Sequence, residues 1–277
     1  DRRQLHHVRA GENVQAGDVL IVTTSDRPEA ATVERALRLS AELRAPYVPR
    51  QGRTIRALLA KRDQPEALVV GPREIRLVPA EGRPFFFHPS MALVRIKGLL
   101  AGGKDAMLEA SGARRGDAVL DCTAGLCSDS LVFSYAVGAG GHVVALEAVQ
   151  VLHAIVREGL RTYETGIPDV DRAMRAIETA RASYEERLPL MPDRSVDIVY
   201  FDPMFEKPVE SSSAMVPLRS LAAREPLTEE AVREAARVAR RRVVLKDHRD
   251  SGRFERLGFR PVSRSSTAVA YGVIDID

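Results

Sequence analysis

The chain has 277 residues, 45% of them hydrophobic, and a formal net charge of +3, values that are ordinary for a globular protein with a large core. Lys and Arg exceed Asp and Glu by 41 to 38, which permits a nucleic-acid partner without demanding one. No apolar run reaches the ~18–20 residues of a membrane span and no signal peptide is visible, so we expect a cytoplasmic protein. Cys122 and Cys127 are spaced too closely for a disulfide framework and lack a second pair for zinc. His6, His7 and His88 have no metal-ligand spacing, so we expect no metal.

Residues 1–88 are predicted to form a small α/β domain. Its first helix is predicted to begin with Asp26 as N-cap and Glu29 completing a capping box, and its second with Thr54 as N-cap. We find no catalytic constellation here, so the role of this domain stays open between substrate docking and a structural cover. The expected elements are strands at 18–24, 47–48, 67–71, 74–78 and 84–88 and helices at about 27–43 and 55–61.

Residues 89–277 are predicted to form a second, larger domain in which strands and helices alternate. Regular alternation of this kind is typical of a doubly wound, mostly parallel sheet, here of seven strands. A closing antiparallel hairpin distinguishes this domain from a plain dinucleotide-binding fold. The expected elements are helices at 91–100, 130–136, 151–160 and 228–239 and strands at 118–122, 142–147, 173–178, 196–201, 242–247, 261–263 and 268–274.

Two carboxylates are expected at neighbouring strand ends of this sheet. Asp121 ends the strand before the turn Thr123-Ala124-Gly125, where glycine allows a ligand to approach the backbone, and Glu147 ends the next strand. A carboxylate in the position of Glu147 can bind both hydroxyls of a ribose. The pattern Gly-x-Gly-x-x-Gly is missing, because Cys127 stands where a second glycine would be, so a pyrophosphate lacks its usual cradle. A ligand with adenosine but no phosphate fits better, and S-adenosylmethionine is the common one.

A further polar group follows the predicted strand 196–201. Asp202 and the carbonyl next to Pro203 can accept hydrogen bonds from an amino group, and Phe205 offers a ring for stacking on a flat base. The segment 206–225 is too long for an ordinary connection and is predicted to be a substrate loop. The alternative reading of this stretch is a strand end, a proline turn and a core aromatic.

The order of these motifs resembles the class I S-adenosylmethionine-dependent methyltransferases, and most closely the family of 16S ribosomal RNA guanine-N2 methyltransferase J. That family reads Asp-Ala-Thr-Ala-Gly-Leu-Gly-Arg-Asp where this chain has residues 121–129, and Val-Val-Tyr-Leu-Asp-Pro-Met-Phe where it has 198–205. Gly102-Gly103 and the basic strand ending at Lys246 also have counterparts. The resemblance covers roughly residues 88–250. Two departures, Cys127 for a glycine and Ser128 for an arginine, affect the end of the cofactor that carries the amino acid.

The resemblance implies a set of cofactor contacts. Ser128 and Asp129 would contact the amino-acid end of the cofactor, Glu147 and Ala148 its ribose, and Ala182 and Ser183 its adenine. The alternative for Ser183 is a helix N-cap before the segment 184–188. The predicted cofactor-binding residues are Asp121, Thr123, Ala124, Gly125, Ser128, Asp129, Glu147, Ala148, Ala182, Ser183 and Asp202, and the predicted catalytic residues are Asp202, Pro203 and Phe205.

The implied reaction is direct methyl transfer to an exocyclic NH2 group, with small-subunit rRNA as the expected partner. The target base would leave its stack and pack on Phe205, while Asp202 and the Pro203 carbonyl orient the amino group. Lys207, Lys246 and Arg249 are candidates for phosphate contact, with plain solvation as the alternative. Three rivals remain: methylation of DNA or of protein (glutamine or isoaspartate), a non-catalytic cofactor-binding module, and a nicotinamide oxidoreductase, which the missing glycines disfavour. The sequence carries no signal for an oligomeric state.

Overall fold

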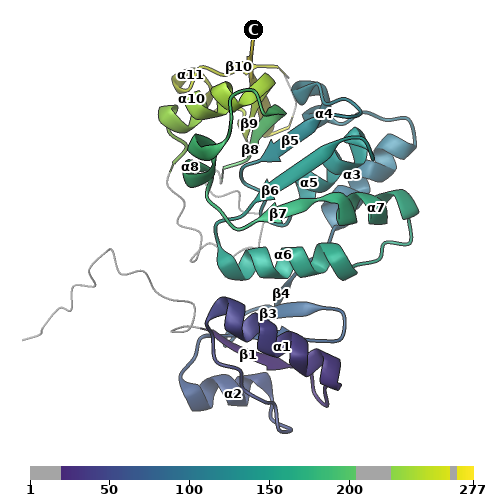
Figure 1. Cartoon of the computed structure of the whole chain (residues 1–277), viewed down its shortest axis with the longest axis vertical. Coiled ribbons are helices and arrows are strands. Elements are labelled where there is room, and N and C mark those ends of the chain that lie inside the picture. Colours follow the sequence, from purple (N-terminus) through teal and green to yellow (C-terminus); the bar gives the residue numbers. More distant parts are fainter. Residues whose placement is uncertain (1–19, 204–225, 263–266) are drawn as a thin grey trace, which may run out of the picture. The chain divides into compact units, whose positions relative to one another are not determined.

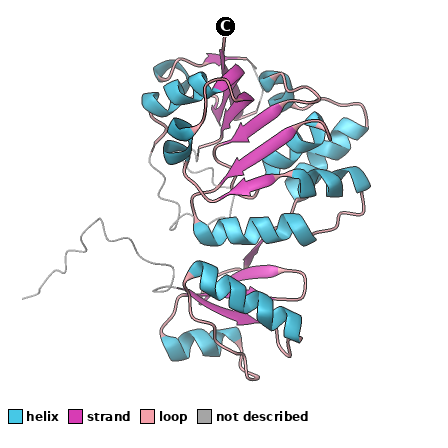
Figure 2. Ribbon diagram, in the orientation of Figure 1, coloured by secondary structure: helices cyan, strands magenta, loops and turns pink. Residues whose placement is uncertain are grey.

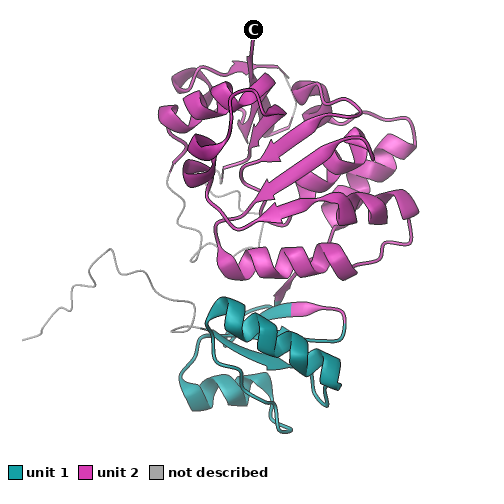
Figure 3. Cartoon of the chain, viewed as in Figure 1, with its two compact units in different colours: residues 1–72, 76–84 teal, residues 73–75, 85–277 magenta. Residues whose placement is uncertain are grey.

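Residues 20–203, 226–262 and 267–277 are described by a computed structural model (Figure 1). The chain divides into two compact units (Figure 3). Unit 1 comprises residues 1–72 and 76–84, and unit 2 comprises residues 73–75 and 85–277. That residues 1–88 and 89–277 are separate domains remains a prediction.

The first part of the described chain contains a four-stranded sheet in the order β1-β2-β3-β4, with β1 and β2 parallel. The capping box predicted for Asp26 is wrong, because Arg27 turns the backbone into the left-handed region (φ 50°) and the helix begins only after Glu29. The predicted cap of the second helix is confirmed: Thr54 Oγ1 accepts from the Ala57 N–H. The elements are β1 (Leu20–Thr24), α1 (Ala30–Leu43), α2 (Ile55–Arg62), β2 (Glu66–Val70), β3 (Ile75–Pro79) and β4 (Phe85–Phe86).

The rest of the chain forms a seven-stranded sheet in the order β10-β11-β9-β8-β5-β6-β7. Strands β9, β8, β5, β6 and β7 run parallel. β11 runs antiparallel to β9, and β10 pairs antiparallel with β11 to close the sheet. The predicted fold class and hairpin are therefore confirmed. The elements are α3 (Ser90–Leu100), α4 (Ala106–Ser111), β5 (Ala118–Asp121), α5 (Ser128–Val137), β6 (His142–Leu146), α6 (Gln150–Thr162), α7 (Pro168–Ala176), β7 (Glu178–Ala180), α8 (Tyr184–Arg187), a 3-10 turn (Leu188–Leu190), β8 (Val196–Phe201), α10 (Glu229–Val238), β9 (Ala239–His248), α11 (Arg253–Arg256), β10 (Arg260–Pro261) and β11 (Val269–Asp275).

The strand predicted at 173–178 is wrong. Most of this segment belongs to α7, and the strand itself, β7, follows at Glu178–Ala180. Pro168 occupies the first turn of α7, where its missing N–H costs nothing, and Asp169 and Asp171 complement the helix dipole there. Val170, Ala173 and Met174 are buried at helical spacing.

Helices cover both faces of the seven-stranded sheet (Figure 2). Residues of α8, α10 and α11 join one hydrophobic cluster with the sheet, and the side chains of Phe201 and Leu245 point into it. α3 and α5 lie over the opposite face (Figure 1), where the ring of Phe133 on α5 packs edge-on against Tyr200 with centroids 5.2 Å apart. Because side chains alternate along a strand, Tyr200 faces the α5 layer while Phe201 faces the other.

Candidate active site

The turn after β5 is held by Asp121, which is 1% exposed. Its Oδ1 accepts from the Thr123 N–H at 3.1 Å, and its Oδ2 accepts from the Ser130 hydroxyl at 2.6 Å. Burial raises the pKa of Asp121 to about 7, although the Ser130 hydrogen bond acts in the opposite direction. Asp121 therefore stabilises the turn through buried hydrogen bonds, and its carboxyl group is not exposed on the surface of the turn.

Left-handed backbone shapes the rest of the turn. Gly125 has φ +53° and Cys127, at the N-cap of α5, has φ 60°. A Cβ added at Gly125 would meet no atom of the described chain within 4 Å, so the turn faces open space there. The Ala124 N–H donates to the Leu146 carbonyl at 3.1 Å, which joins this turn to the end of β6.

Glu147 follows β6 and is 3% exposed. Its Oε2 accepts from the Gly125 N–H at 3.2 Å and its Oε1 from the Val149 N–H at 2.9 Å. Its carboxylate thus lies directly against the glycine turn, as the sequence predicted for two neighbouring strand ends. Ala148 is exposed beside it.

The reversal of strand order lies between β5 and β8, where open α/β sheets bind their ligands. Here the Asp202 N–H donates to Thr123 Oγ1 at 2.6 Å, which joins the two strand ends. Pro203 is buried, whereas the side chain of Asp202 is 28% exposed. Phe205 and Lys207 lie outside the described residues.

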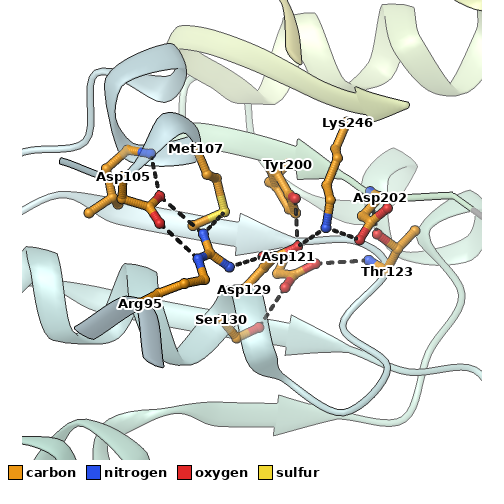
Figure 4. A network of polar contacts seen from close by, with 11 residues as sticks. Arg95, Asp105, Met107, Asp121, Thr123, Asp129, Ser130, Tyr200, Asp202 and Lys246 are labelled. Carbon is orange, nitrogen blue, oxygen red and sulfur yellow. Dashed lines mark hydrogen bonds and ion pairs between the residues drawn. The ribbon is translucent and has the colours of Figure 1, made fainter. Parts of the chain in front are cut away.

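A network of alternating charges surrounds Asp129 in the first turn of α5 (Figure 4). Asp129 Oδ1 binds Arg95 Nη1 at 2.5 Å, and its Oδ2 accepts from the Tyr200 hydroxyl at 2.6 Å. Lys246 Nζ lies 3.3 Å from Asp129 Oδ2 and 3.0 Å from Asp202 Oδ2. The structure therefore brings the two predicted carboxylates, Asp129 and Asp202, to one cation.

Strand register explains why these side chains meet. In the parallel pair β8–β9, Tyr200 lies beside Val244, so Asp202 and Lys246, two residues further on, project from the same face. That face is the one covered by α5, which supplies Asp129. The sequence makes Lys246 a candidate for phosphate contact, and the structure gives it two carboxylate partners.

The network shifts the titration of its members. Burial alone would raise the pKa of Asp129, but the Lys246 and Arg95 cations and the Tyr200 hydroxyl outweigh it and hold the pKa at about 2. Burial likewise works against the charge of Lys246, and Asp129 and Asp202 overcome it, so the Lys246 pKa is raised. Burial raises the pKa of Asp202, and Lys246 partly offsets that rise.

Arg95 connects the network to α3 and α4. Its guanidinium binds both oxygens of Asp105, at 2.7 and 3.0 Å, while Asp105 also accepts from the Leu108 N–H as the N-cap of α4. Sequence reasoning missed Arg95, Asp105 and Tyr200. Tyr200 could have been found, because it lies on β8 two positions before Asp202, so the two side chains point to the same side. Arg95 and Asp105 carried no local signal of this kind.

The remaining predicted residues lie at the edges of this arrangement. Ser183 is the N-cap of α8, with its Oγ accepting from the Glu186 N–H at 3.2 Å, so the alternative reading of its side chain is confirmed. Ala182 is half-buried against the hydrophobic cluster of the sheet. Ser128 is half-buried in the first turn of α5.

Three further properties concern the described residues. No group of three or more His, Cys, Asp or Glu side chains within them is arranged to hold a metal ion. Within the same residues, no helix combines the length and the apolar content that crossing a membrane requires. Cys122 and Cys127 are free and buried, as expected for small packing residues.

Among solved structures, the chain resembles an S-adenosylmethionine-dependent methyltransferase from Neisseria gonorrhoeae. The two share 19% identity and a TM-score of 0.61, over 92% of this chain and 95% of that one. At this identity the similarity establishes the fold alone.

Among curated proteins, the chain is 46% identical to the uncharacterized protein YpiP of Bacillus subtilis, over 92% of this chain and 98% of that protein. It is also similar to ribosomal RNA small subunit methyltransferase J of Hahella chejuensis (32% identity, 52% of this chain) and of Buchnera aphidicola (30%, 46%). The chain spans about half the length of each of these two relatives, 55% and 51%.

The family profile of S-adenosylmethionine-dependent methyltransferases termed SAM_MT matches residues 85–256. This stretch contains the glycine turn, both strand-end carboxylates and the charge network described above. The resemblance inferred from the motifs is thereby confirmed at the level of fold, enzyme class and cofactor. The chain belongs to the SAM_MT family, and the protein is a methyltransferase that uses S-adenosylmethionine.

Proposed function

We propose that the protein transfers the methyl group of S-adenosylmethionine to an exocyclic NH2 group, that of guanine N2 in small-subunit rRNA. The observation that carries the proposal is the position of Asp202: it is partly exposed at the strand-order reversal, beside the glycine turn. The two relatives named as rRNA methyltransferases support the choice of rRNA.

The residues around the turn fit the cofactor. Open space at Gly125 accommodates a ligand close to the backbone, and the adjoining Glu147 carboxylate suits ribose hydroxyls. Asp121 and Thr123 support the turn, while Ala124 and Ala148 border it. Toward the adenine we assign the backbone of Ala182 and Ser183, because the Ser183 hydroxyl caps α8.

The charge of the site also fits. Arg95 and Lys246 provide two cations against the three carboxylates of Asp105, Asp129 and Asp202, which leaves one negative charge in excess. The cofactor supplies a methyl group on a positively charged sulfur, which this excess complements. Asp129 Oδ1 retains a lone pair beside its contact with Arg95, so Asp129 and Ser128 can bind the cofactor's amino-acid end.

Asp202 would orient the amino group of the substrate. Lys246 contacts Asp202 Oδ2, so we assign Oδ1, together with the Pro203 carbonyl, as acceptor for the two N–H bonds of the base. Holding both hydrogens in fixed directions aims the nitrogen lone pair at the methyl group, and most of the acceleration would come from this positioning. The stacking assigned to Phe205 stays a prediction.

The test is methyl transfer from labelled S-adenosylmethionine to 30S subunits, naked 16S rRNA, DNA and a protein extract in parallel. Asp202→Ala should abolish transfer and change the cofactor Kd by less than roughly tenfold, because the positioning of the amino group is lost while the turn is kept. Asp169→Ala, at an exposed position of α7, is the matched control and should retain activity.

Label at guanine N2 of 16S rRNA supports the proposal. Label found only in DNA or protein would support methyl transfer by this protein but contradict rRNA as its substrate. Transfer that survives in Asp202→Ala would reject the role of Asp202.

A further inference from the structure

We propose that unit 1 contains an RNA-binding surface, a basic segment of residues 43–62 that contacts phosphate groups. The inference rests on the proposed rRNA substrate and gives unit 1 a role in reaching it. The matched family profile begins at residue 85 and assigns nothing to this part of the chain.

The charge of the basic segment differs from that of the whole chain. Between Glu42 and Asp63 there is no acidic residue, although the chain as a whole carries 41 basic and 38 acidic side chains. A local excess of this size creates a positive potential that attracts polyanions. The six cations of the segment are Arg44, Arg50, Arg53, Arg56, Lys61 and Arg62.

These cations have no ionic partners: within residues 20–203, 226–262 and 267–277, none of the six forms an ion pair. Cations of unit 2 such as Arg95, Arg237 and Arg242 are instead paired with carboxylates. A cation without a protein partner can bind a phosphate without first breaking an ion pair.

Local structure separates the supporting cations from the exposed ones. Arg50 Nε donates to the Arg53 carbonyl at 2.7 Å and so fixes the turn before α2, where Gln51 (φ 50°) and Gly52 (φ 71°) are both left-handed. Arg50 and Arg53 are half-buried. Arg44, at the end of α1, is exposed, as are the three cations of α2.

The outward side of α2 is suited to a nucleic-acid backbone. Leu58 and Leu59 are buried, whereas Arg56, Lys61 and Arg62 are exposed. The exposed positions between these cations, 57 and 60, are both alanine, so no large side chain prevents close approach. The N-terminal end of the helix adds a favourable partial charge for an anion.

The composition favours RNA over an anionic membrane. A helix that inserts into a lipid surface presents large apolar side chains opposite its cations. The large apolar residues of α2 are instead buried, or half-buried in the case of Ile55. Five of the six cations are arginines, whose planar guanidinium matches a phosphate with two hydrogen bonds.

The experiment compares two charge-matched triple variants of the full chain. The first is Arg56→Glu, Lys61→Glu and Arg62→Glu on α2. The second reverses three exposed arginines of unit 2 by Arg114→Glu, Arg115→Glu and Arg233→Glu. Binding of naked 16S rRNA is measured over a NaCl series, together with the cofactor Kd and methyl transfer.

For the α2 variant we expect at least a tenfold weaker rRNA Kd at 0.15 M NaCl. Its salt dependence should fall by about 2 to 3 units of slope, the value for three lost phosphate contacts. The unit 2 variant should stay within about threefold of the wild type, and both variants should keep the cofactor Kd, which reports an intact fold of unit 2.

An α2 variant with the wild-type rRNA Kd and salt slope would overturn the inference. Methyl transfer separates this from a failure of the proposed function. If the wild type methylates rRNA and the α2 variant binds it equally well, only the surface is rejected. If the wild type methylates another polymer while the α2 variant alone loses rRNA binding, only the proposed substrate is rejected.

Discussion

The ammonium nitrogen of Lys246 lies 3.0 Å from Oδ2 of Asp202. The same nitrogen lies 3.3 Å from Oδ2 of Asp129, so one cation holds a carboxylate of α5 and a carboxylate that follows β8. Removing one member of a buried ion pair leaves the other member unpaired, which is why the network gives sharp predictions.

Lys246→Met should lower kcat at least tenfold at pH 7 and move the acidic limb of the pH–rate profile to higher pH. Burial raises the pKa of Asp202 and Lys246 lowers it, so without the cation a smaller fraction of Asp202 is ionised at neutral pH. Activity should recover partly toward pH 9. The control is Arg233→Met, which replaces an exposed cation of α10 by methionine and should leave the pH–rate profile unchanged. An unchanged profile for Lys246→Met would contradict the role of Lys246 in keeping Asp202 ionised.

Asp121→Asn should change how stability depends on pH. Burial raises the pKa of Asp121 in the folded state to about 7. The protonated carboxyl therefore contributes its full stability when the pH is below the pKa that Asp121 has in the unfolded chain. This contribution is lost as the pH rises through about 7. Asparagine can still accept from Thr123 and hydrogen-bond to Ser130 without this penalty. In urea unfolding, the free energy of unfolding of the variant, relative to that of the wild type, should therefore rise by up to about 4 kcal/mol between pH 4 and pH 8.

The control for this measurement is Asp169→Asn, which changes an exposed carboxylate of α7. Its stability difference from the wild type should stay nearly constant over the same range. If the free energy of unfolding of Asp121→Asn and of the wild type changed with pH in parallel, the raised pKa of Asp121 in the folded state would be contradicted.

Cys127→Gly should change the free energy of unfolding by no more than about 1 kcal/mol. A non-glycine residue in the left-handed region, here φ 60°, costs about 1–2 kcal/mol, and glycine removes that strain while losing about 0.5–1 kcal/mol of backbone entropy. Cys127→Val, with a branched side chain at the same φ, should destabilise by at least about 2 kcal/mol. Equal stability of the two variants, measured by urea unfolding, would contradict this account.

Ser183→Ala should lower the free energy of unfolding by about 1 kcal/mol, because the Ser183 hydroxyl caps α8. The hydroxyl is used by the Glu186 N–H, so the cofactor Kd should change less than threefold. Calorimetric titration with S-adenosylmethionine checks the second statement, and Ser183→Asp, another good N-cap, should restore stability. A large loss of affinity with unchanged stability would assign the side chain to the cofactor.

The features that the sequence predicted depend on short stretches of chain. Asp121, Glu147 and Asp202 each stand at the end of a short apolar run that favours a buried strand, and parallel strands place their carboxyl ends along one edge. The order of these motifs was enough to identify the methyltransferase family and its cofactor. One exception among the strands was 173–178, a short segment whose apolar residues fit a strand or a helix; in the structure most of it belongs to α7, which buries Ala173 and Met174.

Only the tertiary structure decided what the charged side chains contact. Arg95 and Asp129 are 34 residues apart in the chain, and Lys246 and Asp129 are 117 apart. Such pairs depend on how α3 and α5 pack on the sheet and on the register of β8 with β9, and no local propensity specifies either. Motifs with short-range causes can therefore be read from the sequence, whereas a network of buried charges exists only once burial makes each unpaired charge unfavourable.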